Sequence, residues 1–243
     1  MVRFIFHRIL LMIPVLFGIT ILNFGIIQLA PGDPADIYLS TSATLADIEL
    51  KREQLGLNAP LWQQYFNWLN YLFHGDFGFS FSSYEPVTKL VLGRVEPTLI
   101  LMGSALTMAY LIAIPIGIVS SIRQYSRLDY TVTLISFLGI SIPPFFLGLA
   151  LIYLFSLKIP LFPSGGIHTL GVADSVSDVL LHLVLPATIL AVGFAGKMVR
   201  YVRASMLEIL EQDYLRTARA KGLSEFVVIT RHAFRNALIP IIT

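Results

Sequence analysis

Apolar residues gather in four long runs along the chain, and most charged residues lie between these runs. The runs cover approximately residues 9–30, 98–120, 130–157 and 179–202. A helix needs about 20 apolar residues to cross a bilayer, so each run is long enough for one membrane span. We therefore predict an all-α integral membrane protein with four spans in this sequence.

The first run is predicted to remain in the protein as a span. It follows the residues MVRFIFHR, lacks a cleavage-site pattern, and is too long for the apolar core of a signal peptide. All four runs contain proline, which removes a backbone donor and kinks a helix. Kinked helices around a wet path suit a transporter, although proline is also common in membrane helices generally. The prolines are Pro14, Pro115, Pro143, Pro144 and Pro186.

Composition supports the membrane assignment and excludes several kinds of chemistry. The chain is 56% hydrophobic and 13% charged, whereas a soluble domain is about 25% charged. There is no cysteine, so there is no disulfide, cysteine-based metal site or thiol nucleophile. The formal charge of +2 is too small to suggest a nucleic-acid partner.

The distribution of basic residues predicts the orientation. Most of them fall on one side of the four spans, and this excess marks the cytoplasmic side. The N-terminus and residues 204–236 are therefore predicted to be cytoplasmic, and residues 31–96 and 158–178 extracytoplasmic. The residues on the cytoplasmic side are Arg3, Arg8, Arg123, Arg127, Lys197, Arg200, Arg203, Arg216, Arg219, Lys221, Arg231 and Arg235; those on the other side are Lys51, Arg52, Lys89, Arg94 and Lys158.

The outer segment 31–96 is too long for an ordinary loop and is predicted to contain helices. Thr44 and Asp47 form a capping-box pattern for a helix over 45–55, which Gly56 ends. Pro60 suits the first turn of a second helix over 60–73. Its aromatic residues are of the kind that lie at the level of the lipid headgroups: Trp62, Tyr65, Phe66, Trp68, Tyr71 and Phe73.

Motifs for catalysis or ion coupling are absent from the sequence. Gly196-Lys197 lacks the earlier glycine and the following Ser or Thr of a phosphate-binding loop. A proton- or sodium-driven carrier is expected to bury carboxylates in mid-membrane, and a membrane-embedded enzyme needs a catalytic constellation; the sequence shows neither. His74, His168 and His182 lie toward the outer face, where they are either hydrogen-bonded structural residues or metal-binding groups.

A few polar residues within the spans could line a path across the membrane. Hydrogen bonding between helices explains any one of them equally well. They are Asn23, Gln28, Ser104, Thr107, Ser136, Ser141 and Thr188.

The cytoplasmic segment 208–236 carries the most specific pattern. Its many Arg and Lys residues cost about 2.5–3.5 kcal/mol each at the centre of a bilayer, so it lies outside the membrane. It also contains enough apolar residues to fold, among them Leu223, Phe226 and Phe234. We interpret it as a structured element presented to a partner; the alternative is a basic surface loop.

This segment resembles the ATPase-coupling loop of ABC importer permeases, in the variant of the dipeptide/oligopeptide/nickel permease family. The resemblance rests on Tyr214, on Thr217-Ala218-Arg219-Ala220-Lys221-Gly222, and on Arg231-His232-Ala233 and Arg235-Asn236-Ala237-Leu238-Ile239-Pro240. The general pattern places Glu-Ala-Ala before the glycine, where this chain has Arg216, Thr217 and Ala218. Matches at 29–34, 54–57, 60–61, 75–78 and 97–99 extend the resemblance from Arg8 to Thr243.

The resemblance implies a permease fold with kinked spans, an outer helical insertion and cytoplasmic coupling helices. It implies that Arg216, Thr217, Ala218, Arg219, Ala220, Lys221 and Gly222 contact the ATPase. We expect Ala218 and Ala220 to allow close approach, Arg219 and Lys221 to reach carboxylates or carbonyls, and Gly222 to reverse the chain. Family members have six spans, so we expect this fold to lack the last two, with a fifth beginning in 237–243.

The resemblance also implies the function and the partners. The chain would be a permease subunit in a bacterial or archaeal cytoplasmic (inner) membrane, forming half of a translocation path for short peptides. Nickel or another small solute is the alternative cargo. The implied partners are a paralogous second permease, two ATPase subunits that bind ATP and Mg, an external solute-binding protein and membrane lipid, with no cofactor on this chain and no nucleic acid.

Overall fold

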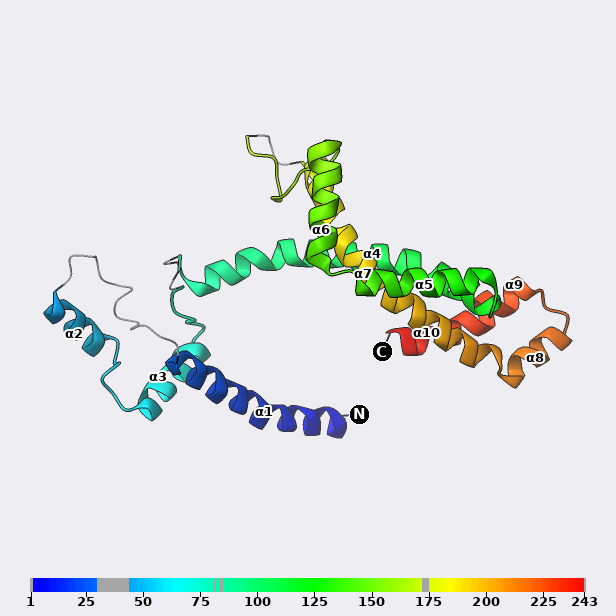
Figure 1. Cartoon of the computed structure of the whole chain (residues 1–243). Helices are drawn as coiled ribbons and strands as arrows, with labels where there is room; N and C mark the ends of the chain where they lie inside the picture. Colours follow the sequence, from blue (N-terminus) through cyan, green and yellow to red (C-terminus); the bar gives the residue numbers. More distant parts are fainter. Residues whose placement is uncertain (1, 30–43, 81, 84, 172–174, 243) are drawn as a thin grey trace. The chain divides into compact units, whose positions relative to one another are not determined.

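The computed structural model describes residues 2–29, 44–80, 82–83, 85–171 and 175–242. The chain divides into two units, Met1–Arg94 and Val95–Thr243. In the described residues the regular elements are helices, and the extended pairing is an isolated bridge between Phe79 and Pro86 (Figure 1). The predicted all-α fold is confirmed.

Helix α1 (Val2–Leu29) is apolar on all sides and leaves its large side chains exposed, from Phe4 at 64% to Leu22 at 66%. A helix that is hydrophobic all round needs lipid or protein to cover it. It is therefore long and apolar enough to cross a membrane, and the helix begins at the second residue, before the predicted start of the span near residue 9. The predicted stop signal at 31–34 lies outside the described residues.

Helix α2 (Leu45–Gln54) begins with the predicted capping pair. The backbone N–H of Thr44 donates to Asp47 Oδ2 at 2.9 Å, and the backbone N–H of Asp47 donates to Thr44 Oγ1 at 3.3 Å. Hydrogen bonds from the Thr44 hydroxyl and backbone hold the pKa of the Asp47 carboxyl below its usual value, because they favour the charged form. Gly56, with φ of 69°, follows the helix as predicted.

Helix α3 (Leu61–Phe73) packs against α1. The Tyr65 hydroxyl is 2.9 Å from Thr20 Oγ1, and the Tyr65 ring meets Phe17 and Phe24 edge-on at centroid distances of 6.0 and 5.4 Å. Thr20 lies midway along the predicted first span. Tyr65 therefore holds α3 against the side of α1, and the location of the other aromatic residues of α3 at headgroup level stays a prediction.

In the second unit, two long helices correspond to the predicted spans 98–120 and 179–202. They are α4 (Val87–Ile122), which begins in the first unit, and α7 (Val176–Leu210). With α1, they are the helices of the described residues that are long and apolar enough to cross a membrane singly. Small residues let α4 and α7 approach, because Ala109 packs against Ala191 and Ala195.

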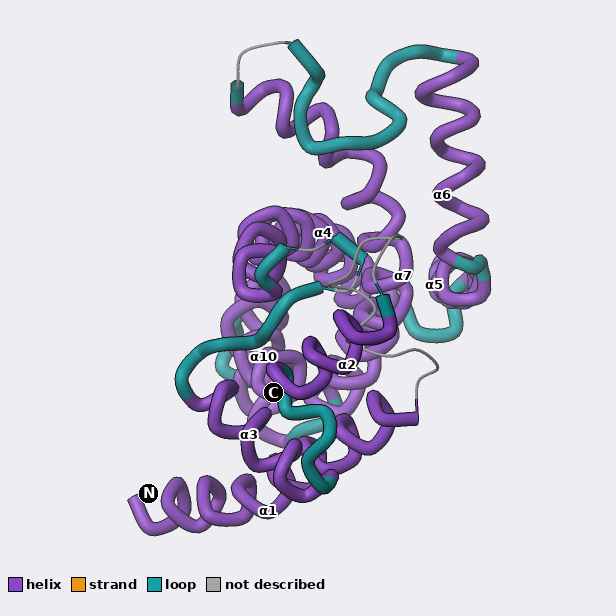
Figure 2. The backbone as a smooth tube through the Cα atoms, turned by 90° about the vertical axis from the view of Figure 1, so that its left-hand side faces the viewer, coloured by secondary structure: helices purple, strands orange, loops and turns teal. Residues whose placement is uncertain are grey.

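The predicted third span, 130–157, is broken in two. Helix α5 (Arg127–Ser141) meets α6 (Pro144–Ile152), which continues as a π-helical segment η2 (Tyr153–Lys158), at an angle of 92° (Figure 2). A residue before proline is pushed out of the helical region, and Ile142 and Pro143 accordingly have extended ψ values of 121° and 131°. The chain therefore turns at Pro143-Pro144, whereas Pro14, Pro115 and Pro186 lie inside helices.

Four short elements follow α7. They are α8 (Asp213–Ala220), α9 (Glu225–Val227), the π-helical segment η3 (Val228–Phe234) and α10 (Arg235–Ile242). Figure 1 shows α8 and α9 at the end of α7 that lies near the start of α5. A buried core joins α8, η3 and α10 to α7; its residues are Val202, Met206, Leu215, Ala218, Val228, Ala233 and Ala237.

Candidate functional site

Helix α8 is attached to the rest of the unit by one face and exposed on the other. Leu215 and Ala218, three residues apart, are 0% and 7% exposed and belong to the core around Met206. Arg216, Thr217 and Ala220 lie on the exposed face. The expectation that Ala218 allows a partner to approach closely is thus wrong, because its methyl group is buried in the chain's own core.

The charged residues of this segment are partly paired with one another. Arg219 Nε donates to Glu225 Oε1 at 2.9 Å, and Arg216 Nη1 is 3.7 Å from Asp213 Oδ1. Arg219 was expected to reach a partner, but its guanidinium is held across the turn between α8 and α9. Lys221 is exposed and has no ion pair to another described residue.

Gly222 turns the chain after α8. Its φ is +78°, in the left-handed region, and its N–H donates to the carbonyl of Arg219 at 2.9 Å. A Cβ placed at Gly222 would meet nothing within 4 Å. The glycine is therefore required for the backbone conformation that ends the helix, not for space.

A buried ion pair joins the C-terminal part of α7, close to α8, to the start of α5. Asp129 is 3% exposed, and Arg203 donates to its two carboxylate oxygens from Nε and Nη2, each at 2.7 Å. The hydroxyl of Ser120 and the backbone N–H of Tyr125 also donate to Asp129. One carboxylate thus joins the end of α4, the connection to α5, the start of α5, and α7.

The sequence pattern does not predict this network. Arg203 is one of the basic residues on the predicted cytoplasmic side, and Asp129 lies just before the predicted third span. The available signal was local: Ser126 precedes the helix by one residue and accepts from the backbone N–H of Asp129 at 3.2 Å, as an N-cap does. The partner of the Asp129 carboxylate, 74 residues away, had no signal in one sequence.

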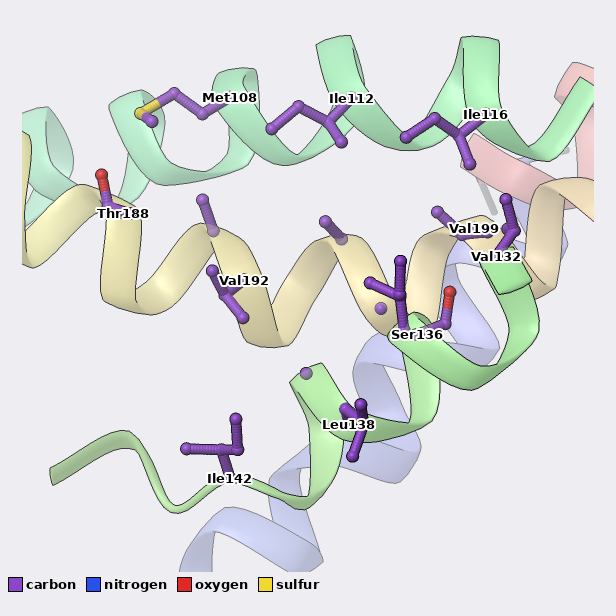
Figure 3. A pocket seen from close by; sticks show the side chains of 15 residues that line it. Met108, Ile112, Ile116, Val132, Ser136, Leu138, Ile142, Thr188, Val192 and Val199 are labelled. Carbon is purple, nitrogen blue, oxygen red and sulfur yellow. The ribbon is translucent and has the colours of Figure 1, made fainter. Parts of the chain in front are cut away.

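Two of the predicted path-lining residues come together. Ser136 of α5 and Thr188 of α7 line a hollow of about 400 Å³ between α4, α5 and α7 (Figure 3). The remaining lining is apolar, with Met108, Ile112 and Ile116 of α4 on one side.

The other predicted path-lining residues lie elsewhere. The hydroxyls of Ser104 and Thr107 each donate to a carbonyl one turn earlier in α4, at 2.7 Å, which is ordinary behaviour for a membrane helix. Ser141 is exposed at the end of α5. Asn23 and Gln28 belong to the first unit, where Gln28 Nε2 donates to Gln64 Oε1 at 3.3 Å.

Two glycines lie where neighbouring helices leave no room for a side chain. A Cβ at Gly196 would lie 2.7 Å from the backbone oxygen of Ser136, and a Cβ at Gly117 would lie 2.7 Å from Val202 Cβ. Gly196, which superficially suggested a phosphate-binding loop, therefore serves helix packing.

Two of the outer histidines have hydrogen-bond partners within their own helices. His182 is 7% exposed, with Nδ1 2.9 Å from the carbonyl oxygen of Asp178, and His74 Nδ1 is 2.8 Å from the carbonyl oxygen of Asn70. Among the described residues, His, Asp and Glu form no group of three suited to a metal ion.

Comparison with known proteins identifies the class. Residues 113–243 match the family described as "Binding-protein-dependent transport system inner membrane component", and residues 1–102 match the N-terminal domain of such membrane components. The chain belongs to this family, the permease subunits of ABC importers, and it is a membrane protein.

The relatives are permease proteins of peptide and glutathione transport systems. The chain is 44% identical over 244 residues to the oligopeptide transport system permease protein AppB of Bacillus subtilis, covering all of this chain and 77% of the relative. It is 44% identical over 246 residues to a putative peptide permease protein of Brucella suis, with the same coverages. It is 37% identical over 243 residues to the glutathione transport system permease protein GsiC of Escherichia coli K12, covering all of this chain and 76% of that protein.

Proposed function

We propose that this permease subunit forms half of a translocation path for short peptides, which a solute-binding protein delivers and partner ATPases drive. The observation that carries the proposal is the similarity, across the whole chain, to permeases of oligopeptide, peptide and glutathione systems. Glutathione is itself a tripeptide, so these names share one substrate class. Nickel, the alternative cargo, has no supporting observation among the described residues.

The exposed face of α8 is the proposed ATPase contact. Arg216, Thr217, Ala220, Lys221 and Gly222 are accessible there. The buried face of α8 is packed through Leu215 on Met206 of α7, so α8 cannot be displaced without disturbing that core. A partner that pushes on α8 would therefore move α7, which lines the hollow containing Thr188.

Transport by the purified complex tests the proposal. Proteoliposomes that contain the permease pair and the ATPases should hydrolyse ATP several-fold faster with peptide-loaded binding protein, and should accumulate labelled peptide. The permease alone should show no saturable ATP binding. Nickel uptake without peptide uptake, or ATP binding by this subunit alone, contradicts the proposal.

A pair of variants tests the contact surface. Ala220→Trp adds a large ring to the exposed face of α8 and should reduce the recovery of ATPase with the permease. Gln124→Trp makes the same change at an exposed position between α4 and α5 and should leave ATPase recovery at the wild-type level. Equal loss in the two variants would show that α8 is not the specific contact.

A further inference from the structure

A second hollow, of about 510 Å³, lies between α5 and α7 and differs in character from the apolar one. Its lining includes Lys197, Arg200, Tyr201 and Arg203 of α7 and Phe137 of α5. It therefore combines three cationic side chains with two aromatic rings on one lateral face of the second unit.

Two of the three cations are available to a ligand. Arg203 is neutralised by Asp129 behind it. Lys197 and Arg200 are exposed and have no ion pair to another described residue. The guanidinium of Arg200 lies 4.9 Å from the centre of the Phe137 ring, and this cation–π contact holds it at the hollow.

The position along α7 places the hollow at a membrane surface. The predicted fourth span ends at 202, and Lys197 and Arg203 are separated by about 9 Å along the helix at 1.5 Å per residue. Tyr201, 64% exposed, is of the type found at headgroup level. By the distribution of basic residues, this surface belongs to the cytoplasmic leaflet.

Apolar side chains of α5 continue from the hollow toward the middle of the predicted third span. Phe137, which lines the hollow, and the next residue, Leu138, are 49% and 53% exposed. A ligand with an anionic head and apolar chains that point into the bilayer would fit both features.

We propose that the hollow binds the phosphate of an anionic phospholipid of the cytoplasmic leaflet, with Lys197 and Arg200 contacting the headgroup and an acyl chain lying along α5. Charge complementarity favours this occupant, since basic clusters between membrane helices on this side attract anionic headgroups. The inference goes beyond the proposed function because it depends on membrane location and not on the transported solute.

Native mass spectrometry of the purified transporter complex tests the proposal, after delipidation and addition of phosphatidylglycerol or phosphatidylcholine. The wild-type complex should retain phosphatidylglycerol in preference to phosphatidylcholine. Lys197→Gln/Arg200→Gln should bind phosphatidylglycerol about thirty-fold more weakly, since each basic residue near a surface contributes about 1 kcal/mol. Arg123→Gln/Arg127→Gln, which removes two exposed cations outside the hollow, should bind it as the wild type does.

Four other results of this experiment would each overturn the proposal. Equal retention of the two lipids would mean that the hollow holds acyl chains only. Equal loss in both double variants would mean diffuse attraction by surface charge. Displacement of the lipid by millimolar inorganic phosphate would identify a free anion as the ligand. Absence of phosphatidylglycerol from the wild type, together with poorer assembly of Lys197→Gln/Arg200→Gln, would identify an acidic partner subunit as the occupant.

Discussion

At the scale of single residues, the Asp129–Arg203 pair holds the membrane helices together where the coupling segment begins. Asp129 also accepts from Ser120 and from the backbone of Tyr125, so its carboxylate has partners for both oxygens. A satisfied pair of this kind contributes little relative to an apolar pair, but losing one partner leaves an uncompensated charge. The Asp129–Arg203 pair therefore acts mainly by fixing α7, one turn before Met206, against α5.

Asp129→Asn should therefore destabilise the permease by about 2–3 kcal/mol, less than a fully buried pair because Arg203 retains partial exposure. Thermal unfolding in detergent measures the effect. Asp213→Asn is the matched control, since its partner Arg216 is at 3.7 Å and both side chains are exposed, so almost no change is expected. Equal stability of the two variants would show that the buried pair has no structural role.

The second residue-scale prediction concerns Gly222. Gly222→Val should weaken the turn by about 1–2 kcal/mol, because a β-branched residue resists a φ of +78°. We expect membrane insertion to persist and stimulation of ATP hydrolysis by loaded binding protein to be lost.

Gly222→Asn separates conformation from size, since asparagine tolerates the left-handed region and the surrounding space is open. In the same proteoliposomes, Gly222→Asn should retain most of the stimulation of ATP hydrolysis by loaded binding protein. Stimulation at the wild-type level in Gly222→Val would show that this turn does not couple the ATPase to the spans.

At the scale of helices, the crossing of α5 and α7 depends on the absence of a side chain at Gly196. Gly196→Ala should destabilise the permease by about 1–3 kcal/mol, because the new methyl group would lie 2.7 Å from the Ser136 carbonyl and the helices must separate. Gly193→Ala, three residues earlier in the same helix, meets nothing within 4 Å and controls for helix propensity. Thermal unfolding of the two variants should differ accordingly, and an equal effect would mean that the crossing adapts without cost.

The helices themselves could be predicted from the sequence, but several contacts between them could not. Apolar run length predicted α1, α4 and α7, because a bilayer imposes a minimum length on a helix. Thr44, Asp47 and Gly56 marked the ends of α2 because helix caps are local. Burial of Ala218 and the packing of Tyr65 on α1 were not predictable. Hydrophobicity indicates only that a side chain avoids water, and it does not indicate which residue the side chain contacts. The Pro143-Pro144 pair predicted a kink, but not a turn of 92°.

At the scale of the whole molecule, the predicted membrane topology decides whether the proposed ATPase contact on α8 and the proposed lipid site lie on the cytoplasmic side. The excess of basic residues predicts that the connection between α4 and α5 and the segment from α8 to η3 lie in the cytoplasm, and that the start of α7 and the segment before α4 lie outside. Because the chain has no cysteine, single cysteines report these positions without background from the permease itself. Ser83→Cys and Ser177→Cys should react with an impermeant thiol reagent added to intact cells, whereas Gln124→Cys and Ser224→Cys should react only after the membrane is opened; all four positions are exposed. Reaction of Ser224→Cys in intact cells would place α8 on the outer face, where no ATPase can reach it, and would overturn both the coupling surface and the assignment of the cationic hollow to the cytoplasmic leaflet.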